Sequence, residues 1–175
     1  PLQGVSAAER LSSIAQDELE GMLIENSDEP YAREIARQIV SDLRRGIKIE
    51  TTSSLHGEIE KALLREKMTA AERKEAVRKS SARTFQALRI DVNSEFEVLE
   101  ELLEKLPDAL APGGKVAILT FHSGEDRLVK HAFKYGKKVG IYSDVAKDVI
   151  RPSKEECAQN GRAKSTKMRW AIKVK

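Results

Sequence analysis

Residues 110–130 read LAPGGKVAILTFHSGEDRLVK, and this stretch decides the fold. A turn of proline and two glycines comes first. The six residues from Val116 to Phe121 follow it and are apolar on both faces if Thr120 is included, a pattern typical of a strand buried inside a parallel sheet. Gly124 and Glu125 then open a segment with helical spacing of its apolar residues. The stretch therefore predicts the strand-to-helix corner of an α/β sheet.

The residues before this stretch predict helices. Two capping-box pairs mark helix starts, Ser6 with Glu9 and Thr69 with Glu72. The second pair opens a short, charge-rich helix over residues 69–79. The strongest signal runs over 83–106, where apolar residues recur every three or four positions as one buried stripe, with a break or kink indicated at Asn93 and Ser94.

The residues after the stretch predict the remainder of a sheet. Residues 139–142 fit a short strand, and a short helix is expected after Pro152. Residues 167–175 alternate between apolar and basic side chains, which indicates a half-exposed strand whose lysines suit a sheet edge. No glycine-rich strand-to-helix loop is present, so the sequence reads as a helical unit followed by the back half of an α/β sheet, without a nucleotide-binding half.

Composition bounds the function classes. The 175 residues are 40% hydrophobic and 34% charged, enough to bury a core, and no apolar run approaches the ~18 residues of a membrane span. No secretory leader is visible, one cysteine excludes a disulfide framework, and the three histidines lack the spacing of zinc ligands. Residues 1–110 carry 16 basic and 22 acidic side chains, whereas residues 111–175 carry 15 and 6. The basic C-terminal third indicates an anionic partner such as nucleic acid, or else a solvated lysine-rich surface.

Five segments together resemble one known family. They are PLQGVSAAERL (1–11), YAREIARQIV (31–40), ARTFQALRIDVNSE (82–95), the opening stretch at 110–130, and NGRAKSTKMR (160–169). In this order and spacing they are similar to the MraW/RsmH-type methyltransferases, which methylate the N4 amino group of a cytidine in small-subunit ribosomal RNA. The resemblance spans essentially the whole chain and roughly the last three-fifths of a full-length member. Two residues depart from the family pattern: Gly124 stands where leucine is usual, and Gly161 where proline is usual.

The resemblance implies an α/β fold with a helical insertion domain (residues 1–82) followed by the C-terminal half of a class I, Rossmann-like methyltransferase sheet (residues 83–175). It implies S-adenosyl-L-methionine as the cofactor of the full-length enzyme. The family's glycine-rich cofactor loop and acidic ribose ligand have no counterpart here, so no cofactor-binding residue is assigned. We expect this chain alone neither to bind the cofactor nor to be active.

The candidate catalytic residues, His122 and Ser123, end the predicted strand, where open α/β sheets bind their ligands. For methylation of N4, the amino nitrogen must lie in line with the methyl group of the donor. Hydrogen-bond acceptors for the two hydrogens of the amino group help to expose its lone pair. His122 as a neutral acceptor or Ser123 as a hydrogen-bond partner suits this role; alternatively, both only cap the next helix. Glu125 and Asp126 complement the positive end of that helix, so we interpret them as capping residues.

Basic residues supply the candidate RNA contacts, which are Arg83, Arg89, Arg127, Arg162, Lys164, Lys167 and Arg169. The last four either bind phosphates or lie on a solvated sheet edge. Arg83 and Arg89 either bind phosphates or pair with acids of the helical unit.

The sequence therefore predicts part of an rRNA (cytosine-N4) methyltransferase. The alternatives are a non-catalytic RNA-binding module derived from that family and a helical protein-interaction domain. The expected partner is small-subunit rRNA or the ribosomal subunit, with no membrane partner and no metal. The expected location is the bacterial cytoplasm, with the chloroplast as the alternative, and the oligomeric state is left open.

Overall fold

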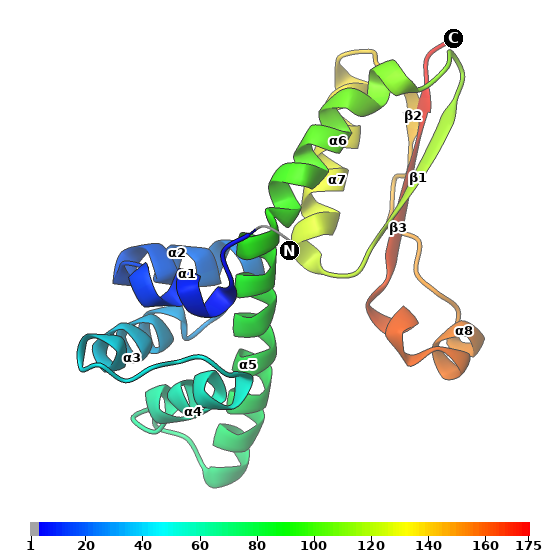
Figure 1. The fold of residues 1–175 in the computed structure, drawn as a ribbon. Helices are drawn as coiled ribbons and strands as arrows, with labels where there is room; N and C mark the ends of the chain where they lie inside the picture. Colours follow the sequence, from blue (N-terminus) through cyan, green and yellow to red (C-terminus); the bar gives the residue numbers. More distant parts are fainter. Residues whose placement is uncertain (1–3) are drawn as a thin grey trace. The chain divides into compact units, whose positions relative to one another are not determined.

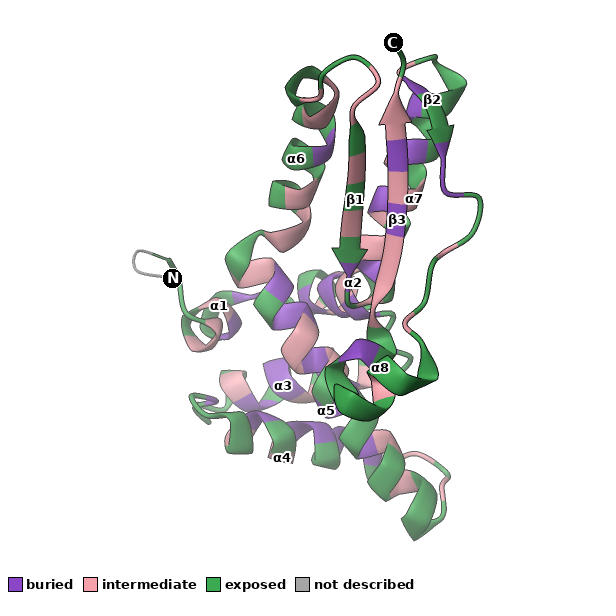
Figure 2. Cartoon of the chain, turned by 90° about the vertical axis from the view of Figure 1, so that its right-hand side faces the viewer, coloured by how far each residue is buried: buried purple, intermediate pink, exposed green. Residues whose placement is uncertain are grey.

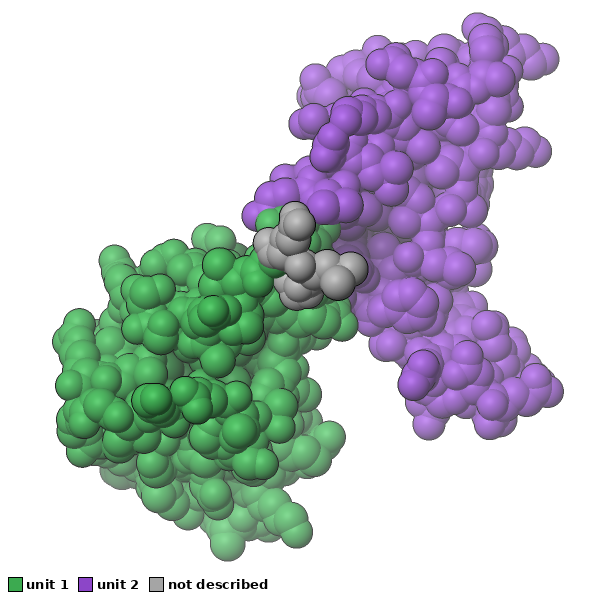
Figure 3. Space-filling view, viewed as in Figure 1, with its two compact units in different colours: residues 1–95 green, residues 96–175 purple. Residues whose placement is uncertain are grey.

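The structure, a computed structural model, describes residues 4–175 and divides into two compact units, residues 1–95 and 96–175 (Figure 3). Each unit is described by itself. Residues 1–3, at the start of the first segment similar to the family, lie outside the described residues. The division into an insertion domain (1–82) and a methyltransferase part (83–175) stays a prediction.

The described residues of the first unit form a bundle of helices (Figure 1). These are α1 (Ala7–Ser13), α2 (Gln16–Ser27), α3 (Ala32–Arg44), α4 (Thr52–Leu63) and α5 (Ala70–Asn93). Both predicted capping boxes are present, at the starts of α1 and α5. The predicted end of a helix near Lys79 is wrong, because α5 continues through Ser80 and Thr84. Both of these polar residues are buried, and Ser80 donates a hydrogen bond to Glu29.

The core of the first unit lies between α5 and the shorter helices. Leu19, Leu23, Ile35, Ile39, Ile59 and Leu63 are fully buried in it. Each such side chain contributes roughly 1.5–3 kcal/mol when it leaves water. Leu88 of α5 is buried in this core and Phe85 packs against it, so α5 and the shorter helices share one hydrophobic core.

The predicted break within the long helix is confirmed at Ser94. Its φ of 49° is left-handed, which ends α5, and the chain begins again as α6 (Glu95–Ala109). The apolar stripe is therefore not continuous. Leu88 packs in the first unit, whereas Leu99 and Leu103 pack in the second.

The second unit is a three-stranded sheet with helices on one side (Figure 1). After α6 come β1 (Lys115–Thr120), α7 (Ser123–Lys138), β2 (Tyr142–Val145), α8 (Lys154–Gln159), the 3-10 helix η1 (Gly161–Ser165) and β3 (Lys167–Lys173). The strand order is β1-β3-β2, and both pairings are antiparallel (Figure 2). Val116, Ile118 and Ala171 pack toward α6 and α7, with Val129 and Phe133 on the facing side of α7.

The prediction that β1 is buried on both faces in a parallel sheet is wrong for the part of the chain that the structure describes. Its only partner there is β3, antiparallel, with Val116 opposite Ala171 and Leu119 opposite Met168. Successive residues of β1 alternate between exposed and partly buried, and Leu119 is 58% exposed. No element of residues 96–175 covers that face of β1 and β3 along the strands (Figure 2). β1 is thus an edge strand with an uncovered apolar face.

The expectation that the last strand is a sheet edge is also wrong, because β3 lies between β1 and β2. Its basic side chains have partners inside the unit. The Lys173 Nζ donates to the carbonyl oxygens of Pro107 and Leu110, at 2.6 and 2.8 Å, which satisfies acceptors at the end of α6. Arg169 pairs with Asp126 of α7.

Among residues 4–175, no helix is both long enough and apolar enough to span a lipid bilayer.

Candidate functional site

The corner between β1 and α7 is built by reciprocal capping. His122 has an extended backbone and is the N-cap of α7, and its Nδ1 accepts the Glu125 backbone N–H at 3.5 Å. The Glu125 Oε2 in turn accepts the Phe121 N–H at 2.8 Å. The capping roles inferred for His122 and Glu125 are therefore present in the structure. Ser123 follows as the first residue of the helix, and it is exposed.

The His122 ring lies beside a carboxylate. Its Nε2 is 3.3 Å from the Glu125 Oε1, is shielded from solvent, and makes no hydrogen bond. Burial raises the pKa of Glu125, but the neighbouring His122 and the Phe121 N–H outweigh it and bring that pKa to about 2. Since Nδ1 is an acceptor, a neutral ring carries its proton on Nε2. In that tautomer the Nε2 is a buried donor, and the acceptor role expected of His122 in methyl transfer stays a prediction.

A second aromatic ring contacts His122. Phe96, on the first turn of α6, has its ring centroid 5.7 Å from that of His122, with 41° between the two planes. Phe96 belongs to the predicted apolar stripe, and its contact with His122 was not predicted. The sequence feature that could have indicated this contact is Gly124, because a glycine in the first turn of a helix leaves space that another side chain can occupy.

The first turn of α7 is tied to β3 by a buried ion pair. The Arg169 Nε and Nη2 donate to the two Asp126 oxygens at 2.7 and 3.1 Å, and Arg169 is only 7% exposed. The Lys167 Nζ lies 3.7 Å from the same carboxylate. Burial raises the pKa of Asp126, but Arg169, Lys167 and Lys130 together lower it by more, so the pKa lies below its ordinary value. The structure thus gives Arg169 an internal partner, and its RNA contact stays a prediction.

Three other predicted RNA-binding residues of the second unit are exposed. Arg162 and Lys164 lie on η1, directly before β3, and Arg127 lies on the second turn of α7. The Lys167 side chain is largely buried beside Asp126. The structure therefore brings Arg162 and Lys164 together on one short segment, and both can reach a phosphate without breaking an ion pair seen here.

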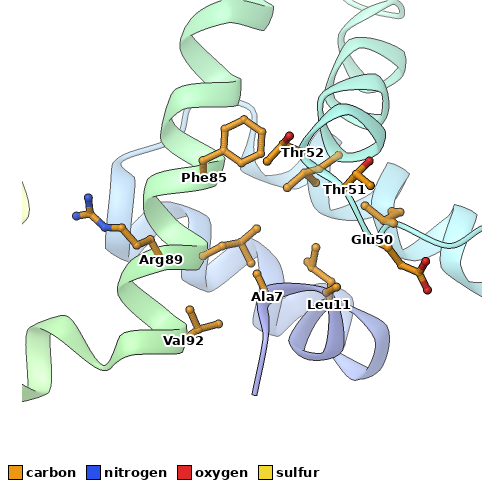
Figure 4. A pocket seen from close by; sticks show the side chains of 12 residues that line it. Ala7, Leu11, Glu50, Thr51, Thr52, Phe85, Arg89 and Val92 are labelled. Atoms are coloured by element: carbon orange, nitrogen blue, oxygen red, sulfur yellow. The ribbon is translucent and has the colours of Figure 1, made fainter. Parts of the chain in front are cut away.

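The two candidates of the first unit pair with acids. The Arg83 Nη1 lies 3.9 Å from the Oε2 of the buried Glu29, and the Arg89 Nε lies 2.9 Å from the Glu95 Oε1. Arg89 also borders a pocket of about 300 Å³ between α1, α4 and α5, but its side chain extends away from the hollow (Figure 4). Phosphate binding by either arginine stays a prediction.

Residues 4–175 do not fit S-adenosyl-L-methionine. A cofactor of this kind needs an open glycine loop after a strand, with backbone N–H groups facing it. At the β1–α7 corner the glycine is Gly124, and the Phe96 ring fills the space where a Cβ would stand. Gly114 turns against its own chain, since a Cβ there would lie 2.7 Å from the Ala111 carbonyl oxygen.

Comparison with known proteins identifies the family of the chain. A model described as the MraW methylase family matches residues 1–174, and the chain belongs to that family.

Relatives agree with this assignment. The chain is 62% identical over 174 residues to "Ribosomal RNA small subunit methyltransferase H 1" of Lachnoclostridium phytofermentans, a match that covers 99% of this chain and 47% of the relative. It is 60% identical to the protein of the same name from Agathobacter rectalis, and this match covers 99% of this chain and 49% of the relative. The "Ribosomal RNA small subunit methyltransferase H" of Kosmotoga olearia is 42% identical, and this match covers 97% of this chain and 54% of the relative. The chain thus spans about half the length of the curated relatives it matches.

Proposed function

We propose that this chain is the RNA-contacting portion of a methyltransferase that transfers a methyl group from S-adenosyl-L-methionine to the N4 amino group of a cytidine in small-subunit rRNA. Its partner is then the rRNA or the ribosomal subunit, and its location the bacterial cytoplasm. The relatives named above are bacterial proteins, so the chloroplast alternative gains no support. The cofactor is held by parts of the enzyme other than residues 4–175.

The incomplete sheet is the observation that carries this proposal. Within the described residues β1 has one partner, its outer edge is unpaired, and Leu119 and Phe121 are 58% and 56% exposed. A flat, apolar, unpaired edge promotes aggregation in a free-standing module. Further strands on this edge and a cover on the bare face would complete an α/β sheet, as the implied Rossmann-like fold requires. This favours part of an enzyme over the alternative of an independent RNA-binding module.

The site chemistry supports the same reading. The amino nitrogen of cytosine is conjugated with the ring and is a poor nucleophile, so the base must be held in a fixed orientation outside any stack. The His122 Nε2 is buried at the carboxyl end of β1 and makes no hydrogen bond, although it lies 3.3 Å from the Glu125 Oε1. A buried polar atom in this state has hydrogen-bonding capacity that a ligand can use. We assign His122 and the exposed Ser123 to holding the cytidine.

Methyl transfer by a completed enzyme tests the proposal. This chain replaces the matching segment of the Lachnoclostridium phytofermentans relative, and transfer of radiolabelled methyl groups to small-subunit rRNA is measured. We expect the chimera to methylate N4 of cytidine, with the unaltered relative as the positive control. The 175-residue chain alone should be inactive. An inactive but folded chimera, or a product methylated elsewhere, would contradict the proposal.

A further inference from the structure

Gly124 is needed for space and not for its backbone freedom. It lies buried in the first turn of α7, and its φ is not in the left-handed range. A Cβ at this position would stand 2.5 Å from the Phe96 Cζ and 3.3 Å from the His122 Cε1. Atoms this close cannot coexist without a shift, so a side chain at position 124 and the Phe96 ring compete for one space.

The Phe96 ring lies outside the main core of its unit. That core is formed by residues such as Leu103, Val129 and Phe133, and Phe96 is not packed among them. Its ring is instead next to Gly124 and His122. Removing the ring therefore changes the surroundings of His122 more than it changes the core.

The imidazole is confined on three sides. Its Nδ1 accepts the Glu125 N–H, its Nε2 faces the Glu125 carboxylate, and the Phe96 ring lies beside it, tilted by 41°. The first two contacts come from one residue of α7, whereas the third comes from α6. The Phe96 ring is therefore the contact that α6 supplies to the imidazole.

We propose that Phe96 is a positioning residue for His122, and that Gly124 is the residue that admits its ring. This rests on the proposed function insofar as His122 holds the cytidine. Phe96 then sets the orientation of the imidazole at the strand end, and a displaced imidazole slows methyl transfer without weakening RNA binding. A misplacement near 1 Å is enough to lower a rate by up to ~10²-fold.

The first test reads the ring directly. The 175-residue chain is labelled at histidine, and NMR spectra are compared for the unaltered chain, Phe96→Ala, Phe96→Leu and the control Tyr135→Ala. Tyr135 is an aromatic residue of α7 that is 65% exposed. We expect the His122 ring signals to move in both Phe96 variants, because the neighbouring aromatic ring is lost, and to stay in place in the control. Unchanged His122 signals in folded Phe96→Ala would overturn the proposal.

The second test measures rates in the chimera. Phe96→Ala should lower kcat about tenfold with KM for RNA nearly unchanged, since ring orientation and not binding is lost. Tyr135→Ala should match the unaltered chimera. A normal kcat in Phe96→Ala, while His122→Ala is slow, would overturn the positioning role. If His122→Ala is itself as fast as the unaltered chimera, the proposed function of His122 fails, and the NMR comparison still shows whether the Phe96 ring contacts the imidazole.

The third test exchanges the two side chains. Gly124→Leu alone should displace the Phe96 ring and move the His122 signals, whereas the signals of Gly124→Leu combined with Phe96→Ala should lie close to those of Phe96→Ala alone, because the leucine then enters a space that is already empty. A kcat of the double variant close to that of Phe96→Ala alone would show that both residues act on one space. Effects that simply multiply would mean that positions 96 and 124 act independently, contrary to the proposal.

Discussion

His122 is the residue on which a structural and a functional interpretation can be separated. It caps α7 through Nδ1, and its Nε2 is a buried donor without a hydrogen bond. A cap contributes about 1 kcal/mol of stability, whereas a group that positions the reacting base contributes to the rate.

In the chimera, His122→Ala should therefore lower turnover by ~10²–10³-fold, with cofactor affinity nearly unchanged. Single-turnover rates and thermal melts on the same sample check this. A variant that melts earlier and methylates at the normal rate would assign His122 to capping alone.

Glu125 makes the same corner sensitive to acid. Its pKa in the folded chain is about 2, below the 4.5 of an unperturbed carboxyl, so its contribution to folding is complete above about pH 4.5 and is lost as the pH falls toward 2. We expect the free energy of unfolding to fall over this range, and to fall less steeply in Glu125→Gln. Denaturant titrations between pH 2 and 7 measure it, with the exposed Glu104→Gln of α6 as the control. Equal pH slopes for the Glu125 variant and the unaltered chain would refute this account.

At the scale of elements, the Asp126–Arg169 pair joins α7 to β3. Removing one partner leaves a buried charge, which typically costs about 3–5 kcal/mol, and partial exposure puts the value here at the lower end. Arg169→Met should therefore lower the unfolding free energy by about 3 kcal/mol, and Asp126→Asn combined with Arg169→Met by less than the sum of the two. Chemical denaturation of the four proteins in this cycle measures the coupling. A strictly additive cycle would mean that the pair does not join the two elements.

The same elements show which parts of the fold the sequence predicts. Helix starts at Ser6 and Thr69 were predicted correctly because a capping box is a contact between residues three apart. The break at Ser94 was equally local. The position of β3 in the sheet depends on partners far away along the chain, since Ala171 pairs with both Val116 and Val145. Periodicity shows that β3 has two unlike faces but not which strands flank it.

In the candidate site, too, local contacts could be predicted from the sequence and contacts between distant residues could not. The capping of α7 by His122 lies within one turn and could be inferred, as could the exposed basic residues Arg162 and Lys164. The partner of Arg169 could not, because alternation along a strand does not distinguish a charge that faces water from one that faces Asp126. Phe96 was missed since its contact with His122 joins residues of two different helices.

At the scale of the whole molecule, RNA binding should depend on salt through Arg162 and Lys164. Each phosphate contact contributes about 0.7 (single strand) to 0.9 (duplex) to the slope of log K against log salt. The variant with both residues changed to alanine should thus have a slope shallower by about 1.5. Binding to small-subunit rRNA fragments between 50 and 200 mM salt tests this. Lys115→Ala, at the start of β1, is the matched control, and an unchanged slope in the double variant would make η1 a solvated surface.

The 175-residue chain should not bind S-adenosyl-L-methionine, because the strand-to-helix corner within residues 4–175 has its glycine, Gly124, filled by the Phe96 ring and offers no open loop for the cofactor. Isothermal titration calorimetry of the chain against the cofactor should give no heat beyond dilution, while the chimera should bind. A micromolar dissociation constant for the chain alone would point to a cofactor site that these residues do not suggest.

The central position of β3 in the sheet also determines when the sheet can form during synthesis of the chain. The helical unit is complete once residue 95 has been synthesised, and its contacts join neighbouring helices. β1 and β2 are made early, yet neither pairs with the other, since each pairs with β3. These three strands can therefore join only after residues 167–173 have left the ribosome, so their pairing is a late step of folding.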